Sequence, residues 1–353
     1  MSWRSLTPGS KMENLIEKEE LIQNCLEQGN KEAAIKLLFE LVVDCAKQKN
    51  FEAAEAMRSR IFDIDAMALS EIIRSGEIIE EEKSRTIDRG HREIWAKLYD
   101  SLSAEEANAL YFACKKATYP TEGKIFQQDE WKSRLYFVNS GRARVVYFLD
   151  GKELFLRAVE RGELAGEDTF FSLSMCTTTM IAQYRTEVSY LDSDILKVWR
   201  TTFPMLESKL QGFASSVEKI ADLLKARKMD RRRLRRVNPG WKATALLMST
   251  SEQPVGKPFK VDLCDISRGG TCFFVKITKK ETASLLLGKR LCISYLHPLM
   301  DPSYTVRQSG TIVAVHFHPF EDCAVNVKFD TLLPEAPIEQ LAKLSLPSLA
   351  LDF

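Results

Sequence analysis

The sequence predicts a multidomain α+β protein in which helices come first and a small antiparallel β-barrel comes last. Two observations support this prediction. The first 95 residues are polar and show helical periodicity, whereas residues 229–346 contain short apolar segments separated by turn residues. With 353 residues and 45% hydrophobic side chains, the chain is long enough for two or three domains with apolar cores.

The N-terminal region, residues 1–95, is expected to be helical. Three segments are amphipathic and predict helices, over residues 13–26, 31–47 and 51–68. The segments Asn30–Ala34 and Asn50–Ala54 repeat the same turn and helix start at an interval of 20 residues, although one pair is too little for a solenoid. Residues 76–92 are expected to form a charged linker or an exposed helix. The region either caps the next domain or docks a protein partner, and the cap is favoured.

The C-terminal part contains six strand-like segments. Each is apolar or alternates with period two, and each is bounded by Gly, Pro or Asp: residues 241–248, 259–263, 271–277, 290–296, 304–317 and 323–329. Short strands with turn signals at this spacing are typical of a small antiparallel barrel. We therefore expect a six-stranded antiparallel β-barrel.

Two clusters of polar residues lie at the start of this barrel. The first is the arginine-rich run Arg231–Arg236, and 29 residues later come Asp265, Ser267 and Gly270. Guanidinium groups bind phosphates through paired hydrogen bonds and stack on planar rings. Asp and Ser side chains can hydrogen-bond base edges, and glycine allows a close approach. These residue types favour a compact dianion that carries flat bases.

The pattern Arg-x-x-x-Arg followed by Asp-x-Ser-x-x-Gly resembles the signature of PilZ domains, which are bacterial receptors for cyclic di-GMP. The pair Arg232 and Arg236 fits best, because Val237 then follows as the family's small apolar residue does. Arg231 with Arg235 has the same spacing, so both registers stay open. The resemblance covers about residues 229–346.

This resemblance implies a role for each matched residue. Arg232 and Arg236, with Arg231 beside them, would hold the phosphates and stack on guanine, from an arm that is flexible when the ligand is absent. Asp265 and Ser267 would hydrogen-bond the second guanine at the barrel wall. Gly270, the last matched residue, would permit the turn between two strands.

The middle of the chain resembles the cyclic-nucleotide-binding domain of the catabolite activator family, over about residues 96–202. The matching segments are Leu135–Val145, Gly162–Glu167 and the aromatic pair Phe170-Phe171. This resemblance implies a β-roll with flanking helices. Its family binds the ribose hydroxyl of its ligand with a Gly-Glu pair, which would be Gly166 and Glu167 here.

The phosphate-binding part of that pattern is missing. Where the family places an arginine against the cyclic phosphate, this chain has Thr177 and Thr178, and Arg185 comes several residues too late. A buried phosphate without a cationic partner is strongly unfavourable. We therefore expect a degenerate roll that binds no cyclic mononucleotide and serves a structural or dimerising role.

A connecting helix is expected over residues 203–228. Its apolar residues alternate at steps of four and three, which is the pattern of a coiled-coil seam: Leu206, Leu210, Phe213, Val217, Ile220 and Leu224. The matching helix of the resembled family dimerises, so we expect a homodimer through residues 206–224. The alternative is one stripe, broadened by Ala214 and Ala221, that packs on its own roll.

The overall composition excludes several classes of protein. The net charge of +1 gives no global field for nucleic acid or membrane. The eight cysteines form no C-x-x-C pair, so neither zinc nor a disulfide framework is expected, and Cys264 and Cys272 are expected to be small buried apolar residues. We find no signal peptide and no membrane-spanning apolar run, which predicts a cytoplasmic protein. No catalytic motif or cofactor signature is present.

The sequence thus predicts a cytoplasmic bacterial receptor for the second messenger cyclic di-GMP, and not an enzyme. Ligand binding at the barrel would rearrange the domains and signal to an unknown protein partner. One alternative is a PilZ-like scaffold that has lost its ligand and acts through protein contacts. The other is a nucleic-acid-binding regulator, which is disfavoured because no helix-turn-helix pattern follows the predicted seam.

Overall fold

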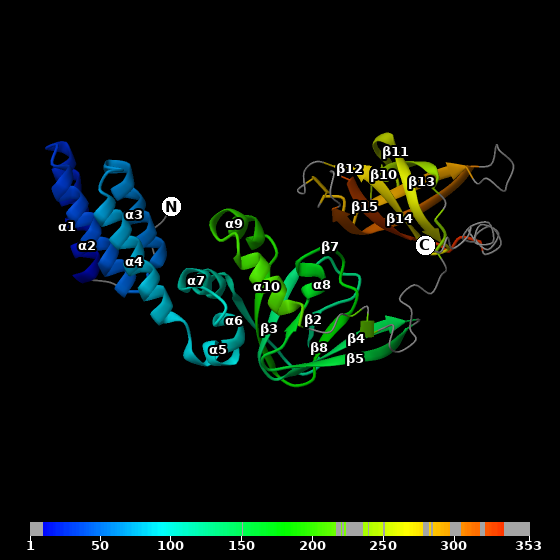
Figure 1. Ribbon diagram of the computed structural model, residues 1–353, viewed down its shortest axis with the longest axis horizontal. Coiled ribbons are helices and arrows are strands. Elements are labelled where there is room, and N and C mark those ends of the chain that lie inside the picture. Colours follow the sequence, from blue (N-terminus) through cyan, green and yellow to red (C-terminus); the bar gives the residue numbers. More distant parts are fainter. Residues whose placement is uncertain are drawn as a thin grey trace, which may run out of the picture. The chain divides into compact units, whose positions relative to one another are not determined.

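A computed structural model of the chain shows two compact units, Met1–Ala113 and Cys114–Phe353 (Figure 1). The structure describes residues 10–149, 151–216, 220, 222–223, 236–238, 240–249, 251–277, 282–283, 285–296, 305–317 and 322–334. Arg231 and Arg232 therefore lie outside the described residues, as does Arg235. Each unit is described by itself.

The first unit is helical, as expected. Its helices are α1 (Ser10–Glu27), α2 (Lys31–Lys47), α3 (Phe51–Ile64), α4 (Leu69–Thr86), α5 (Arg89–Ile94), α6 (Ala96–Tyr99) and α7 (Ala104–Ala113). Helices α1 to α4 share one apolar core, to which Ile22, Leu38, Ile61 and Ile79 each contribute a fully buried side chain. Residues 76–86 belong to α4 and bury Ile79, so this segment is neither a linker nor a fully exposed helix.

The repeated Asn-containing segments begin helices α2 and α3. The side chain of Asn30 accepts a hydrogen bond from the Ala33 amide at 3.2 Å, and that of Asn50 accepts one from the Ala53 amide at 3.3 Å. Each asparagine satisfies an amide that has no partner inside the helix. The repeat therefore marks two equivalent helix starts.

Residues 115–192 of the second unit form the β-roll, as expected. Two four-stranded antiparallel sheets face each other, with strand orders β1-β9-β3-β6 and β2-β8-β4-β5. The strands are β1 (Lys115–Tyr119), β2 (Lys124–Phe126), β3 (Arg134–Ser140), β4 (Arg142–Leu149), β5 (Lys152–Glu160), β6 (Leu164–Ala165), β8 (Thr179–Ala182) and β9 (Thr186–Asp192). Helix α8 (Glu167–Phe170) and the short strand β7 (Leu173–Ser174) lie between β6 and β8. Side chains of both sheets, such as Tyr136 and Val145, share the core.

The connecting segment differs from the expected continuous helix. After α9 (Ile195–Thr202) comes helix α10 (Leu206–Ala214). At its end, the hydroxyl groups of Ser215 and Ser216 donate to the carbonyls of Gly212 and Phe213. Such bonds compete with helix propagation.

The apolar stripe of this segment is buried within the single chain. Leu206 and Leu210 are fully buried, and Ile220 packs in the roll core. Val217 and Leu224 lie outside the described residues. This burial favours the alternative in which the apolar stripe packs on the roll of its own chain. The homodimer through residues 206–224 stays a prediction.

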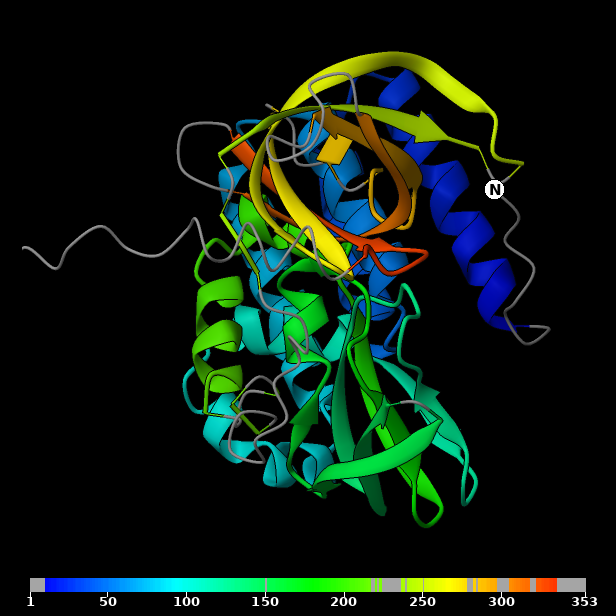
Figure 2. The same ribbon diagram turned by 90° about the vertical axis from the view of Figure 1, so that its right-hand side faces the viewer.

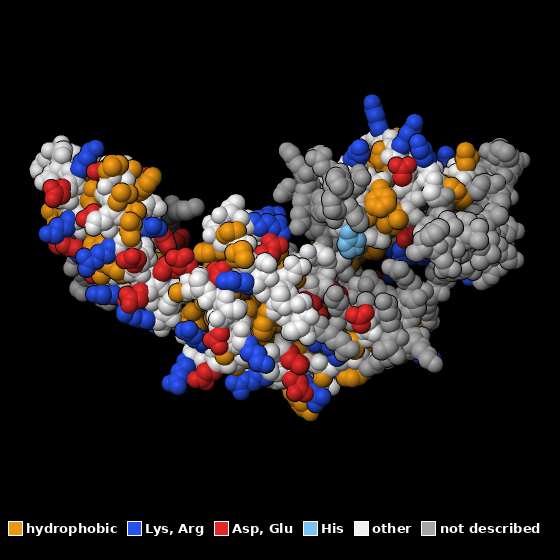
Figure 3. Space-filling view, viewed as in Figure 1, with side chains coloured by type: hydrophobic (Ala, Val, Ile, Leu, Met, Phe, Trp, Pro, Cys, Tyr) orange, Lys and Arg blue, Asp and Glu red, His pale blue; other side chains and the backbone are white. Residues whose placement is uncertain are grey.

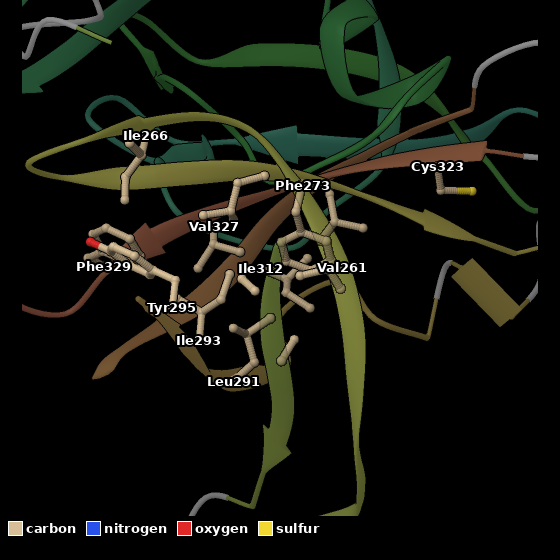
Figure 4. Close-up of a cluster of buried hydrophobic side chains, with 14 of the residues drawn as sticks. Val261, Ile266, Phe273, Leu291, Ile293, Tyr295, Ile312, Cys323, Val327 and Phe329 are labelled. Carbon is tan, nitrogen blue, oxygen red and sulfur yellow. The ribbon is translucent and has the colours of Figure 1, made fainter. Parts of the chain in front are cut away.

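The predicted six-stranded antiparallel barrel is confirmed. Its strands are β10 (Lys242–Met248), β11 (Pro254–Ser267), β12 (Gly270–Lys276), β13 (Arg290–Leu296), β14 (Thr305–Phe317) and β15 (Asp322–Phe329). They pair in the order β13-β10-β11-β12-β15-β14, and β14 pairs with β13 to close the barrel (Figure 2). Figure 4 shows side chains such as Val261, Phe273 and Ile293 meeting inside it.

The roll and the barrel are joined by a short strand pairing. In this pairing β7 lies antiparallel to β14, with Ser174 opposite Ala314. The Met175 amide also donates to the Val313 carbonyl at 2.9 Å. The segment that follows the Gly166-Glu167 turn of the roll is therefore hydrogen-bonded to the barrel.

None of the helices that the structure describes is both long enough and apolar enough to cross a membrane.

Each N-cap asparagine is expected to contribute about 1 kcal/mol to the stability of the helical unit. The two caps lie at opposite ends of α2, whose 17 residues span about 25 Å, so Asn30→Ala and Asn50→Ala should add to about 2 kcal/mol in the double variant. Chemical denaturation of the full chain measures this. Asn24→Ala, an exposed position inside α1, is the matched control and should cost nothing. Equal stability of the double variant and the control would contradict the capping assignment.

Candidate functional site

The hairpin between β11 and β12 brings Asp265, Ser267 and Gly270 together. Ser267 lies opposite Gly270, so only Arg268 and Gly269 form the loop. The loop is tied to the end of the barrel, because the Phe329 amide donates to the Gly269 carbonyl at 2.9 Å. The predicted site residues on the barrel therefore share one rigid corner.

Arg236 reaches this corner from the segment before the barrel. Its Nη1 lies 2.7 Å from Oδ2 of Asp265, and the Arg236 side chain is 31% exposed. The next residue, Val237, pairs with Ile266 through two backbone hydrogen bonds of 2.9 Å. The end of the arm, at Val237, is therefore anchored on β11, and the flexibility expected for the residues before it stays a prediction. The partners Arg231 and Arg232 lie outside the described residues.

The structure gives Ser267 and Gly270 contacts that the resemblance does not imply. The Ser267 hydroxyl is buried and donates to the Gly270 carbonyl at 3.1 Å, a bond that closes the hairpin, and its contact with a guanine stays a prediction. Gly270 has no left-handed backbone conformation. A Cβ atom there would lie 2.3 Å from the Val327 carbonyl oxygen, so glycine is needed for the close approach of β12 and β15.

A register shift in β11 turns the Asp265 side chain away from the barrel core. Val261 and Leu263 point into the barrel core, and strict alternation would send Asp265 inward as well. The register shifts between Leu263 and Asp265, so Ile266 takes the inward position instead. Such a β-bulge places one extra residue, Cys264, on the bulged strand.

The bulge also gathers three groups that can bind a metal. The Sγ atoms of Cys264 and Cys272 and a carboxylate oxygen of Asp265 all lie within 4.8 Å of one another. Burial raises the pKa of the Cys272 thiol to about 12, and the Asp265 carboxylate adds to the effect. The Oδ1 atom of Asp265 is buried without a hydrogen-bond partner. Sequence analysis missed this cluster, because neighbouring residues of a regular strand point to opposite faces.

The second candidate site is the Gly166-Glu167 turn of the roll. Gly166 has φ 88°, and a Cβ atom there would lie 2.2 Å from the Arg134 carbonyl oxygen, so the turn requires glycine. Glu167 follows at the start of α8. Its side chain is only 14% exposed. Burial raises its pKa above the ordinary value, against the lowering effects of its own backbone amide and of Arg157.

Arg157 of β5 is the cation that sequence analysis did not find. Its Nη2 donates to the Leu164 carbonyl at 2.9 Å and lies 3.8 Å from Oε1 of Glu167. The Nε of Arg157 and the Oε2 of Glu167 are both buried without a hydrogen-bond partner. The family's arginine follows the turn in the sequence, whereas Arg157 lies on β5 and precedes Glu167 by ten residues.

Thr177 and Thr178, which stand where the family has its phosphate-binding arginine, have different surroundings. Thr177 donates to the Asp168 carboxylate at 2.9 Å, and Thr178 is buried. Thr177 thus fixes the loop between α8 and β8. No arginine takes the family's position between the described residues Cys176 and Met180.

Neutralising Glu167 is expected to stabilise the fold near neutral pH. A carboxyl group whose folded-state pKa is raised contributes most stability below its unfolded value of about 4.3, and that contribution is lost as pH rises through the folded-state pKa. Calorimetry should therefore show a higher Tm for Glu167→Gln than for the native chain at pH 7, and a smaller difference near pH 4. Glu187→Gln, on the exposed side of β9, is the control. A Tm at pH 7 lower than that of the native chain would mean that the interaction with Arg157 outweighs burial.

Comparison with known proteins agrees with the geometry of the roll. Residues 116–199 match the family model of the cyclic nucleotide-binding domain. No curated protein matches the chain. The N-terminal domain of a transcriptional regulator from Streptomyces coelicolor A3(2) is 23% identical, over 38% of this chain and 90% of that one, with a TM-score of 0.31.

Two further solved structures are similar to this chain. The catabolite activator protein of Thermus thermophilus is 25% identical, over 37% of this chain and 62% of that one, with a TM-score of 0.33. The sensor domain of the transcriptional regulator DNR from Pseudomonas aeruginosa is 16% identical, over 40% and 95% of the two chains, with a TM-score of 0.33. The family match covers the roll and part of α9 and does not extend to the barrel. The similarity to the cyclic nucleotide-binding domain therefore rests on residues 116–199 of this chain.

Proposed function

We propose that this chain is a cyclic di-GMP receptor that signals through protein contacts and has no catalytic activity of its own. The observation that carries the proposal is the ion pair between Arg236 and Asp265 at the exposed corner of the barrel. The arginine-rich run Arg231–Arg236 ends at this ion pair. The barrel fold agrees with the PilZ resemblance of residues 229–346.

The ion pair presents Arg236 in a form suited to a phosphate. A guanidinium group has five N–H donors, and Asp265 engages Nη1 alone in the described contacts. The carboxylate therefore fixes the orientation of the group and leaves other donors for a phosphate oxygen pair. Because Val237 is anchored to Ile266, the guanidinium is held close to its binding geometry before the ligand arrives.

Two contacts offer a route from the barrel to the roll. The pairing of β7 with β14 joins the two domains, and Lys328 Nζ lies 3.3 Å from the Asp129 carboxylate. Lys328 lies opposite Gly270 on the neighbouring strand, so it belongs to the same corner as Asp265. A dianion bound there would compete with Asp129 for the lysine, and this would loosen the barrel from the roll.

The helical unit is our candidate for binding the protein partner. Phe62, Met67, Leu69 and Ile73 of its α3–α4 region each expose more than half of their side chains. Figure 3 shows hydrophobic side chains exposed among acidic and basic ones on this unit. Exposed apolar groups within a charged surface are typical of protein-binding faces.

Arg236→Ala is expected to weaken cyclic di-GMP binding by about 10- to 100-fold, which corresponds to the loss of about 1.5–3 kcal/mol from a charge-assisted hydrogen bond. Isothermal titration of the full chain with cyclic di-GMP measures this. Arg307→Ala removes the same charge from an exposed position on β14 and should bind like the native chain. No binding by the native chain would favour the ligand-free scaffold, and binding to DNA with steep salt dependence would favour the nucleic-acid regulator.

A second candidate function rests on the buried pair in the roll. Arg157 and Glu167 each keep one buried polar atom without a partner, which is costly unless a ligand supplies the missing hydrogen bonds. A guanidinium with a free donor and a carboxyl with a free acceptor suit a ligand that combines an anion with a hydroxyl group. We propose that the roll is a second nucleotide sensor, which uses Arg157 in place of the family's arginine.

This second function predicts saturable binding of cAMP or cGMP that depends on Arg157. Arg157→Gln keeps a hydrogen-bonding side chain but removes the charge, and it should weaken binding at least about 10-fold. Arg142→Gln, exposed on β4, should leave binding unchanged. If neither nucleotide binds the native chain, the roll is structural, as the sequence predicts.

A further inference from the structure

The outer side of the β11–β12 hairpin carries a compact group of three ligand atoms. In a regular antiparallel pair, Cys264 and Asp265 would face opposite sides of the sheet. The bulge places both of them beside Cys272, which lies opposite Asp265 on β12. Cys272 is buried and Cys264 is half-buried, so both thiols are partly shielded from solvent.

We propose that Cys264, Asp265 and Cys272 form a binding site for a thiophilic divalent cation, of which Zn²⁺ fits best. Two thiolates and one carboxylate are ligands that zinc prefers in proteins. Three protein ligands leave one coordination position open for water or another oxygen donor. Hard cations such as Mg²⁺ prefer oxygen ligands, whereas this group of three offers one carboxylate and two thiols.

The distances require only a small adjustment. With zinc–sulfur bonds of about 2.3 Å and tetrahedral angles, ligand atoms lie about 3.5–4 Å apart. The three ligand atoms already lie within 4.8 Å of one another. Contraction by about 1 Å is within the reach of side-chain rotation, because the Cys264 bulge is not constrained to a regular ladder.

The surroundings of Asp265 favour metal binding through one oxygen. Oδ2 is paired with Arg236, whereas Oδ1 is buried without a partner. A metal at Oδ1 would satisfy this atom, and Arg236 would orient the carboxylate as a hydrogen-bonded outer partner. Each thiol transfers its proton to solvent as the metal–sulfur bond forms, so the cation replaces up to two protons and no oxidant is required.

Cobalt substitution tests the site directly. The full chain, kept reduced by a phosphine and freed of metal by a chelator, is titrated with Co²⁺ without nucleotide. We expect one equivalent to produce thiolate-to-cobalt charge transfer with tetrahedral d–d bands, and Zn²⁺ to abolish both. Cys264→Ser and Cys272→Ser should each reduce affinity by more than the 10- to 100-fold that loss of an outer partner costs. Cys292→Ser, half-buried on β13, is the control.

Three results would overturn the proposal: no thiolate band in the native chain, a band that survives in Cys264→Ser, or a band lost equally in Cys292→Ser. Cys264 is half-buried, so its serine variant tests the site even if Cys272→Ser fails to fold. Asp265→Asn should keep a weaker thiolate band. Cyclic di-GMP binding is measured separately in chelator, so failure of the metal site and failure of the receptor function are distinguishable.

Discussion

The β-bulge at Cys264 is the constraint on which the arrangement of Arg236, Asp265 and Cys272 at one corner of the barrel depends. Leu263 and Ile266 both point into the core, although they are three residues apart. A regular strand would turn Asp265 into the core, where an unpaired carboxylate is strongly unfavourable. The bulge instead brings Asp265 to Arg236 and places Cys264 next to Cys272. Both the ion pair of Arg236 with Asp265 and the proposed metal site follow from this one extra residue.

Buried polar atoms without a hydrogen-bond partner occur at both candidate sites. Asp265 in the barrel, and Arg157 with Glu167 in the roll, each keep a buried polar atom without a hydrogen-bond partner. Such atoms lower stability unless a ligand or ion completes them. Burial also raises the pKa of Glu167 above its ordinary value, because desolvation outweighs the attraction of the nearby guanidinium. The roll and the barrel thus each contain a buried polar atom that could hydrogen-bond a ligand or bind an ion, and that lowers stability while it has no partner.

The sequence predicts what depends on local pattern. The six barrel strands follow from alternation and turn residues, and the helix starts follow from the repeated segments at Asn30 and Asn50. Features that depend on register or on distant strands could not be predicted. The bulge at Cys264, the hairpin role of Ser267 and the contact of Gly270 with Val327 each depend on which residues face one another across β11, β12 and β15. Arg157 was missed because it precedes the Gly166-Glu167 turn on β5, whereas the resemblance places the family's arginine after the turn. The apolar stripe from Leu206 was ambiguous, because a coiled-coil seam and a stripe packed on its own domain share one periodicity.

Hydrogen–deuterium exchange of the full chain, with and without saturating cyclic di-GMP, tests whether the barrel corner at Arg236 and Asp265 binds the nucleotide. We expect slower exchange at the backbone pair Val237–Ile266, because a ligand held by Arg236 would clamp the arm onto β11. We also expect faster exchange at Met175, as the pairing of β7 with β14 loosens. Unchanged exchange at Val237 and Ile266 under saturating nucleotide would contradict the claim that this corner of the barrel is the ligand site.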